Sequence, residues 1–230
     1  MSDRTNEQKQ RAAEHAATFV ESGMVVGLGT GSTAIHMVRR LGSLLNAGHL
    51  RDVVCVATSS QTEAEARKLH IPMTTLEAHP VVDLTIDGAD EIDPQLNAIK
   101  GGGGALLREK IVAQASRRVI IVVDESKPSP ILGTQWALPV EVIPFGWGTQ
   151  QAFLKDLGAN VSLRSGSDGQ PFQTDQGNLI LDCGFGPIDQ LDQLNELLNR
   201  RVGIVEHGLF LGLITDLIVA GGEGIRHITR

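Results

Sequence analysis

The sequence of 230 residues is 41% hydrophobic and 20% charged, which favours a globular protein with a substantial apolar core, folded as one large domain or as a large and a small one. Its formal net charge is −7 and it contains no lysine- or arginine-rich run, which argues against nucleic acid as the main partner. No apolar run approaches the ~18 residues that indicate a membrane span, so we expect no membrane partner.

Both cysteines, Cys55 and Cys183, lie inside short apolar segments that are typical of strands. The N-terminus does not resemble a signal peptide. We therefore expect reduced core thiols in a cytoplasmic protein.

Helices and short apolar strands alternate over the first part of the chain, which predicts βαβ units and a parallel sheet. Ser60 and Glu63 have the spacing of a capping box, which predicts a helix that starts at Ser60. The strands are expected at 24–29, 53–57, 81–86 and 118–124, and the helices at 6–23, from Ser32 onward, at 60–69 and at 104–115.

The pattern changes after about residue 133, where short strands separated by turn signals surround two helices. We expect strands at 138–144, 160–164 and 178–183, helices at 149–157 and 188–198, and a return to the first sheet within 208–221. The sequence thus predicts an α/β protein with a Rossmann-like, mostly parallel sheet flanked by helices and a smaller α+β second domain. The catalytic domain is expected to span 1–133 plus 208–230, and the small domain 134–207.

The segment "GLGTGST" (27–33) follows a strand and opens a helix, as phosphate- and dinucleotide-binding loops do. Two features argue against a dinucleotide: Ser32 replaces the third glycine of the fingerprint, and hydroxyl residues follow the strand 53–57 where a ribose-binding acid would stand. The hydroxyls of Thr30, Ser32 and Thr33 suit one small phosphate or polyol. The alternative is a tight turn capped by Ser32, with no ligand.

The segment "TIDGADEID" places Asp87 directly after a buried strand, at the edge where open parallel sheets bind ligands. Gly88 permits a sharp turn, so Asp90 can lie on the same side. The alternative is that Asp87 and Asp90 only cap the loop. Glu91 and Asp93 are expected to be solvated.

Four consecutive glycines, Gly101–Gly104, stand between Lys100 and a predicted helix in "KGGGGALLREK". A flexible linker is one interpretation, but the helical sequence that follows is unlike the flank of a linker. We favour a loop whose backbone amides approach an anion, with Lys100 as a positive point charge.

Glu109 lies about one and a half turns into the predicted helix, where the helix dipole acts more weakly. Its neighbours at three and four residues are apolar and supply no cation: Ala105, Leu106, Val112 and Ala113. A carboxylate on an apolar face tends toward a raised pKa, as a general base requires. Taken alone, it could equally be an ordinary surface glutamate.

The segment "VDESK" ends a strand with Asp124 and Lys127, and Lys127 could bind an anion or only decorate a loop. His207 is expected to be structural. The histidines show no metal-ligand spacing, and neither a calcium loop nor a nucleophile elbow is present, so no metal is expected.

Together, "GLGTGST", "TSSQTEAEA", "DGADEID", "KGGGGALLREK", "VDESK", "LPVEVIP" and "VEHGLF" resemble ribose-5-phosphate isomerase of the A type, in family order and over most of the chain. The resemblance implies interconversion of ribose 5-phosphate and ribulose 5-phosphate in the pentose phosphate pathway, with no metal, nucleotide or other cofactor. It also implies a homodimer or a homotetramer. The segments "RSGSDGQP" and "DCGFGP" are less diagnostic and are expected to matter little for activity.

The resemblance implies Glu109 as the base. The sugar-phosphate site that it implies consists of Thr30, Gly31, Ser32, Thr33, Asp87, Gly88, Ala89, Asp90, Lys100, Gly101, Gly102 and Gly103, with a contact from Lys127.

In the expected mechanism, Glu109 moves a proton from C2 to C1 through a cis-enediolate, and Lys100 with the glycine-loop amides stabilises the oxyanion. Asp87 and Asp90 assist ring opening and transfer hydroxyl protons. Two other classes stay open: a nicotinamide oxidoreductase, against which the missing ribose-binding acid argues, and a non-catalytic sugar-phosphate sensor, which would need no base at position 109.

Overall fold

The computed structural model describes residues 3–230, which form two compact units. The first unit contains the chain up to Ala89, then Arg108–Lys127 and Gly212–Arg230, and the second contains Asp90–Leu107 and Pro128–Leu211. The second unit is therefore larger than the expected range 134–207; residues 1 and 2 of the expected first domain lie outside the described residues.

Strand pairing explains the difference in the boundaries. Two short strands, β4 (Glu91–Ile92) and β5 (Ala98–Ile99), pair with β11 (Leu209–Phe210) in a three-stranded sheet of the second unit. The N–H of Ser129 also donates to the carbonyl of Ile92 at 2.9 Å. These pairings have no signal in the local sequence pattern, because each strand is only two residues long.

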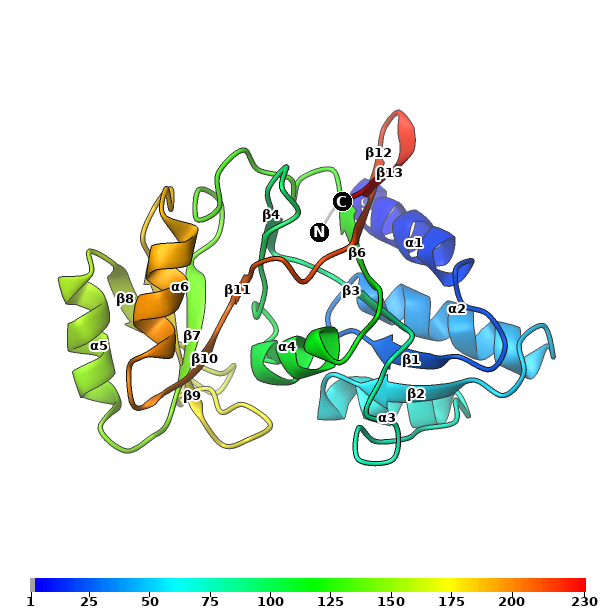
Figure 1. Ribbon diagram of the computed structural model, residues 1–230, viewed down its shortest axis with the longest axis horizontal. Coiled ribbons are helices and arrows are strands. Elements are labelled where there is room, and N and C mark those ends of the chain that lie inside the picture. The colour runs from blue at the N-terminus through cyan, green and yellow to red at the C-terminus, as the bar shows by residue number, and fades with distance from the viewer. Residues whose placement is uncertain (1–2) are drawn as a thin grey trace. The chain divides into compact units, whose positions relative to one another are not determined.

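The first unit is built on a six-stranded sheet in the order β13-β12-β6-β3-β1-β2 (Figure 1). All neighbouring pairs are parallel except the last hairpin, β12–β13, which is antiparallel. The strands are β1 (Val25–Leu28), β2 (Val54–Ala57), β3 (Leu84–Asp87), β6 (Val119–Asp124), β12 (Asp216–Gly221) and β13 (Gly224–Thr229). As predicted, segment 208–221 returns the chain to this sheet through β12.

Helices cover both faces of this sheet. The helices of the unit are α1 (Asp3–Ala17), α2 (Ala34–Asn46), α3 (Ser60–Lys68) and, from Arg108 onward, α4 (Leu106–Gln114). Helices α1 and α2 pack on the face that carries Val26 and Leu28, in one core with Ala12, Met37 and Leu41. Successive side chains of a strand point to opposite faces. A Cβ built at Gly27 would meet Val112 at 2.8 Å, so α4 covers the other face.

The N-cap of α3 differs by one residue from the predicted one. Ser59, with an extended backbone, is the N-cap, and its Oγ accepts from the N–H of Thr62 at 3.0 Å. The helix starts at Ser60, as predicted, but the capping box of Ser60 and Glu63 was wrong because Ser59 and not Ser60 is the N-cap. Both serines fit the cap preference, and only the backbone conformation distinguishes them.

The second unit is built on an antiparallel sheet in the order β10-β7-β9-β8. Its elements are β7 (Leu138–Val142), α5 (Trp147–Asp156), β8 (Asn160–Leu163), β9 (Leu179–Gly184), α6 (Leu191–Asn199) and β10 (Ile204–His207). Leu154 of α5 and Leu198 of α6 share one core with Val140 and Leu181, so both helices cover the same face of the sheet (Figure 1).

Both cysteines are free and buried, Cys55 in β2 and Cys183 in β9. Burial raises the pKa of the Cys55 thiol to about 12 and also raises the pKa of Cys183, to which the charge of Asp182 adds. Among residues 3–230, no helix is long and apolar enough to cross a membrane.

Candidate active site

The loops that follow β1 and β3 meet at the carboxyl edge of the first unit's sheet. Leu28 is in register with Ile86, and the carboxylate of Asp87 accepts N–H groups from Thr30 at 3.0 Å and from Gly88 at 2.7 Å. A Cβ at Gly29 would lie 2.2 Å from Asp87 Oδ1, so only glycine permits this approach. The structure thus brings Asp87, which is 2% exposed, against the loop of Thr30.

The hydroxyl of Thr30 is used inside the protein. Its Oγ1 lies 2.7 Å from Thr58 Oγ1, 2.8 Å from Ser59 Oγ and 3.1 Å from Thr62 Oγ1. The Thr62 hydroxyl also donates to the carbonyl of Gly29 at 3.1 Å. These hydrogen bonds connect the loop to the start of α3. The Thr30 side chain therefore stabilises the conformation of the loop.

Ser32 has a partner that the sequence analysis missed. The ammonium of Lys9 in α1, 2% exposed, donates to Ser32 Oγ at 3.0 Å and lies 4.0 Å from Asp124 Oδ2. Lys9 precedes the buried Ala12 and Ala13 by three and four residues, so the helical spacing could have placed this lysine on the apolar face. A buried ammonium beside a phosphate-type loop is a candidate anion ligand.

Charged groups from the end of β6 surround the same ammonium. Burial lowers the pKa of Lys9, the carboxylate of Asp124 opposes that shift, and the charge of Lys127 adds to it. Asp124 accepts from the N–H of Ser126 at 3.0 Å, and the Lys127 N–H donates to the carbonyl of Asp124 at 3.2 Å. Lys9 and Lys127 therefore place positive charge near Ser32, which is itself exposed before the first turn of α2.

Thr33, at the start of α2, and Gly88, after β3, lie close together at the same edge of the sheet. Thr33 is the N-cap of α2, and a Cβ at Gly88 would lie 3.9 Å from Thr33 Cβ. Helix N-termini carry N–H groups without intrahelical partners and a partial positive charge. The combination of helix start, hydroxyls and two lysines suits a phosphate group.

Glu109 lies in the first turn of α4, because the helix starts at Leu106 and not at residue 104. The expectation that it lies about one and a half turns into the helix was therefore wrong. The carboxylate is 5% exposed, on a helix whose Val112 and Ala113 are 2% and 5% exposed. A buried carboxylate of this kind can exchange a proton with a carbon acid in a site with little water.

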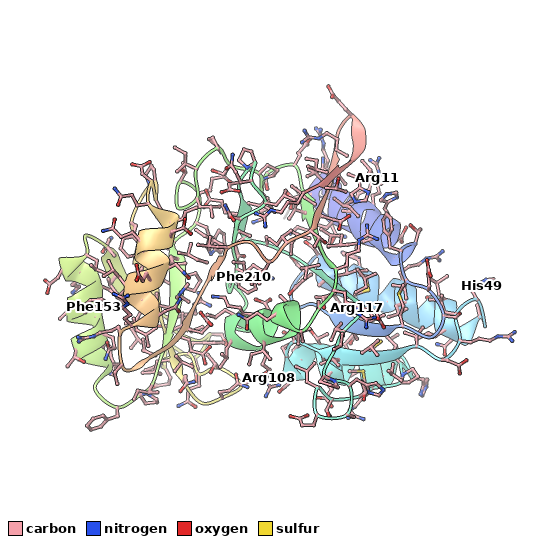
Figure 2. The ribbon with its side chains drawn as sticks, in the orientation of Figure 1. Arg11, His49, Arg108, Arg117, Phe153 and Phe210 are labelled. Carbon is pink, nitrogen blue, oxygen red and sulfur yellow. The ribbon has the colours of Figure 1, made fainter. Side chains whose placement is uncertain are left out.

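The second unit holds Asp90, Lys100 and the glycine loop together. The Asp90 N–H donates to the carbonyl of Ile99 at 2.9 Å, and Asp90 Oδ2 accepts from the N–H of Gly102 at 2.7 Å. Lys100 is 3% exposed, and its Nζ lies 5.5 Å from the ring centroid of Phe210, which Figure 2 labels. A cation over an aromatic face is stabilised without losing its charge.

Three of the four glycines have a physical reason in the structure. Gly101 and Gly104 adopt positive φ values of 103° and 81°, which side-chain-bearing residues rarely do. A Cβ at Gly102 would lie 2.5 Å from Asp90 Oδ1. Gly102 and Gly103 are exposed, so the backbone of the loop reaches the surface of the unit.

Glu91 and Asp93, which were expected to be solvated, are buried at 0% and 5% exposure. The Glu91 carboxylate accepts N–H groups from the loop 133–136, at 3.0–3.2 Å. Asp93 accepts from the N–H of Asn97 at 2.8 Å. The expectation for Glu91 was wrong because its backbone donors come from a segment that begins 42 residues away. His207 is 0% exposed and accepts the N–H of Leu209 on Nδ1 at 3.3 Å, which suits a structural role.

The chain is similar to known ribose-5-phosphate isomerases over nearly its full length. Residues 54–224 match the family ribose 5-phosphate isomerase A (phosphoriboisomerase A). A ribose-5-phosphate isomerase A of Chloroflexus aurantiacus is 56% identical over 225 residues, covering 98% of this chain and 94% of that protein. One from Synechococcus sp. is 51% identical over 226 residues, covering 98% of both.

Solved structures are similar over the whole chain. A D-ribose-5-phosphate isomerase in complex with phospho-erythronic acid superposes with a TM-score of 0.96 at 38% identity, covering 100% of both chains. Ribose 5-phosphate isomerase from Plasmodium falciparum gives a TM-score of 0.95 at 40% identity, covering 98% of this chain and 99% of that one. The predicted fold class is confirmed by these similarities.

Proposed function

This chain belongs to the ribose 5-phosphate isomerase A family, and on that premise we propose that it interconverts D-ribose 5-phosphate and D-ribulose 5-phosphate in the non-oxidative pentose phosphate pathway. The family and the isomerase class predicted from the sequence are thereby confirmed. One structural observation supports the chemistry most directly: the carboxylate of Glu109 is 5% exposed in the first turn of a helix.

Glu109 acts as the base. It removes the proton from C2 of the open-chain aldose and returns a proton to C1 of the enediolate. Since one carboxylate serves both carbons, the two oxygens of the intermediate lie cis and the proton stays on one face. Proton transfer of this kind contributes typically 10²–10⁴-fold to the rate.

Lys100 and the amides of the glycine loop stabilise the negative charge that develops on the oxygen. A fixed cation at 3% exposure interacts more strongly with an oxyanion than a solvated one does. A related isomerase binds phospho-erythronic acid, a phosphorylated sugar acid. Its planar carboxylate has the shape of an enediolate, as expected of a compound that resembles the intermediate of this reaction.

Asp87 and Asp90 open the sugar ring and transfer hydroxyl protons. Each carboxylate accepts backbone N–H groups that orient it: Thr30 and Gly88 donate to Asp87, and Gly102 donates to Asp90. Carboxylates oriented in this way exchange protons with hydroxyl groups without moving themselves.

The start of α2 anchors the phosphate. Ser32 and Thr33 supply hydroxyl and amide donors, while Lys9 and Lys127 supply positive charge. Gly31, with φ of 106°, permits the turn that presents these donors. Ala89, between Asp87 and Asp90, and Gly103, in the glycine loop, are the remaining residues of the proposed sugar-phosphate site.

We further infer a homodimer in the cytoplasm, with a homotetramer as the other possible assembly and no nucleic acid partner. The two free, buried cysteines support a reducing compartment. The net charge of −7 argues against binding nucleic acid. Light scattering of the purified protein measures the assembly directly.

The function is tested by measuring, in a coupled assay, the formation of the ketose from ribose 5-phosphate. Turnover supports the isomerase. Binding of the sugar phosphate without turnover would instead support a sugar-phosphate sensor. Binding of a nicotinamide nucleotide in calorimetry would support the oxidoreductase that the sequence left open.

A further inference from the structure

The hairpin region of the second unit, expected to matter little for activity, contains an arginine that contacts the glycine loop. Nη1 of Arg164 donates to the carbonyl of Gly101 at 2.7 Å and to that of Gly102 at 3.2 Å. Arg164 directly follows β8, and 63 residues separate it from Gly101. The guanidinium is therefore a long-range partner of the loop within this unit.

Arg164 is itself held by a second pair of hydrogen bonds. Its Nε donates to Asp182 Oδ2 at 2.9 Å, and its Nη2 donates to Asp182 Oδ1. Such a fork between guanidinium and carboxylate fixes both groups in one plane. The side chains are 14% and 25% exposed, so solvent competes little with these bonds.

An aromatic ring supports the same two elements. The guanidinium carbon of Arg164 lies 5.9 Å from the centroid of Phe172, and a Cβ at Gly104 would lie 2.4 Å from Phe172 Cε1. The ring therefore contacts the end of the glycine loop as well as the arginine. The loop has a rigid support on the side that Arg164 occupies.

Arg164 and Asp90 bind opposite sides of the same planar peptide group. In the trans peptide between Gly101 and Gly102, the C=O and the N–H point in opposite directions. Arg164 holds the C=O of that peptide, and Asp90 accepts its N–H at 2.7 Å. The same argument for the next peptide, whose C=O also accepts from Arg164, directs the N–H of Gly103 away from the arginine.

We infer that Arg164, braced by Asp182, is a positioning residue for the isomerase reaction: it fixes the Gly101–Gly102 peptide and thereby the carboxylate of Asp90 and the amides of the glycine loop. This inference rests on the proposed catalytic role of Asp90. Arg164 acts through the loop and needs no contact with the sugar. The chain of hydrogen bonds runs from Asp182 through Arg164 and one peptide group to Asp90, all within the second unit.

The experiment is a double-mutant cycle between Arg164→Met and Asp90→Asn, with kcat and KM measured for ribose 5-phosphate. We expect Arg164→Met to lower kcat at least 10-fold and to change KM less than about threefold, because the phosphate is anchored elsewhere. In the Asp90→Asn background, the same substitution should lower kcat less than about twofold. Arg164→Lys, which keeps the charge but loses the fork, should fall between wild type and Arg164→Met.

Arg200→Met is the matched control, because Arg200 forms an exposed ion pair with Glu196 in the same unit and should leave kcat unchanged. Full multiplication of the Arg164→Met and Asp90→Asn effects would overturn the inference, since it would show that Arg164 acts independently of Asp90. Wild-type turnover in Arg164→Met would overturn it equally.

Hydrogen exchange of the Gly102 amide gives a second readout that is independent of catalysis. We expect the amide to be protected in the wild type and to exchange at least 10-fold faster in Arg164→Lys, which also serves if Arg164→Met does not fold. Unchanged protection would overturn the inference. If Asp90→Asn turns over like the wild type, the proposed role of Asp90 fails, and the exchange of this amide alone then decides whether Arg164 positions the loop.

Discussion

The ammonium of Lys9 lies 3.0 Å from the hydroxyl of Ser32, across 23 residues of sequence, and joins the first helix to the loop that we assign to the phosphate. With 2% exposure, Lys9 has little room for hydration. A phosphate bound at Ser32 would therefore interact with a cation that water screens little.

The phosphate assignment predicts a difference between two substrates. Lys9→Met, Ser32→Ala and Thr33→Ala should each penalise ribose 5-phosphate at least 10-fold in kcat/KM and hardly change the slow turnover of free ribose. Remote binding energy supports the chemical step only when the phosphate is present. The coupled assay with both sugars measures this, with the exposed Lys155→Met as control. Equal slowing of both sugars would show that the anchor is in another loop.

Lys9 also predicts a pH dependence of KM. Because burial lowers its pKa below the ordinary 10.5, the lysine loses its proton at a lower pH than a solvated lysine does. The charged form attracts the phosphate, so KM for ribose 5-phosphate should rise as the pH rises through the lowered pKa. In Lys9→Met this rise should be absent. A rise of the same size in the variant would assign it to another group.

The base assignment predicts a large loss in Glu109→Gln. The amide keeps the size and hydrogen bonding of the side chain but cannot accept the proton, so kcat should fall 10²–10⁴-fold while substrate still binds. Stopped assays give kcat, and calorimetry gives binding. Glu196→Gln, on an exposed helix position, is the control. Turnover within about threefold of the wild type would exclude Glu109 as the base.

Proton transfer by side chains alone predicts that activity survives exhaustive treatment with EDTA. Residues 3–230 contain no group of three or more histidine, cysteine, aspartate or glutamate side chains arranged to hold a metal. The measurement is kcat before and after chelation. A loss that a divalent ion restores would mean that the carboxylates around Asp87 and Asp90 bind a metal.

The lowered pKa of Asp216 predicts that the free energy of unfolding falls at acid pH. Burial raises its pKa, but hydrogen bonds from Arg118, Thr215 and His227, with the charge of Arg118, lower the pKa to about 2. The unfolded value is about 3.9, so the folded state binds fewer protons between these values. This contribution, about 2–3 kcal/mol, is present above pH ~4 and is lost as the pH falls toward ~2.

Denaturant unfolding at a series of pH values measures this loss. Asp216→Asn should be less stable than the wild type at neutral pH and should lose less stability between pH ~4 and ~2. The exposed Asp156→Asn is the control, and its curve should run parallel to that of the wild type. Parallel curves for Asp216→Asn and the wild type would contradict the assignment.

The residues of the candidate site could be proposed from the sequence because they are concentrated in short segments. Strand-then-glycine patterns predicted the loops after β1 and β3, and the structure brings Thr30 and Asp87 together at that edge. The predictions that were wrong concern exposure and helix starts. Glu91 is buried, and its carboxylate accepts backbone N–H groups from 133–136. Helix α4 starts at Leu106, so Glu109 lies in its first turn.

Local sequence patterns were sufficient to predict the alternation of strands and helices and the glycine loops, because these features depend on local periodicity and local backbone freedom. The distant side chains that support the loops became known only from the packing of the folded chain: Lys9 contacts Ser32, and Arg164 contacts Gly101 across 63 residues. Such contacts depend on how whole elements pack. A charged residue in a helix or at a strand end looks like any solvated residue until packing excludes the water around it.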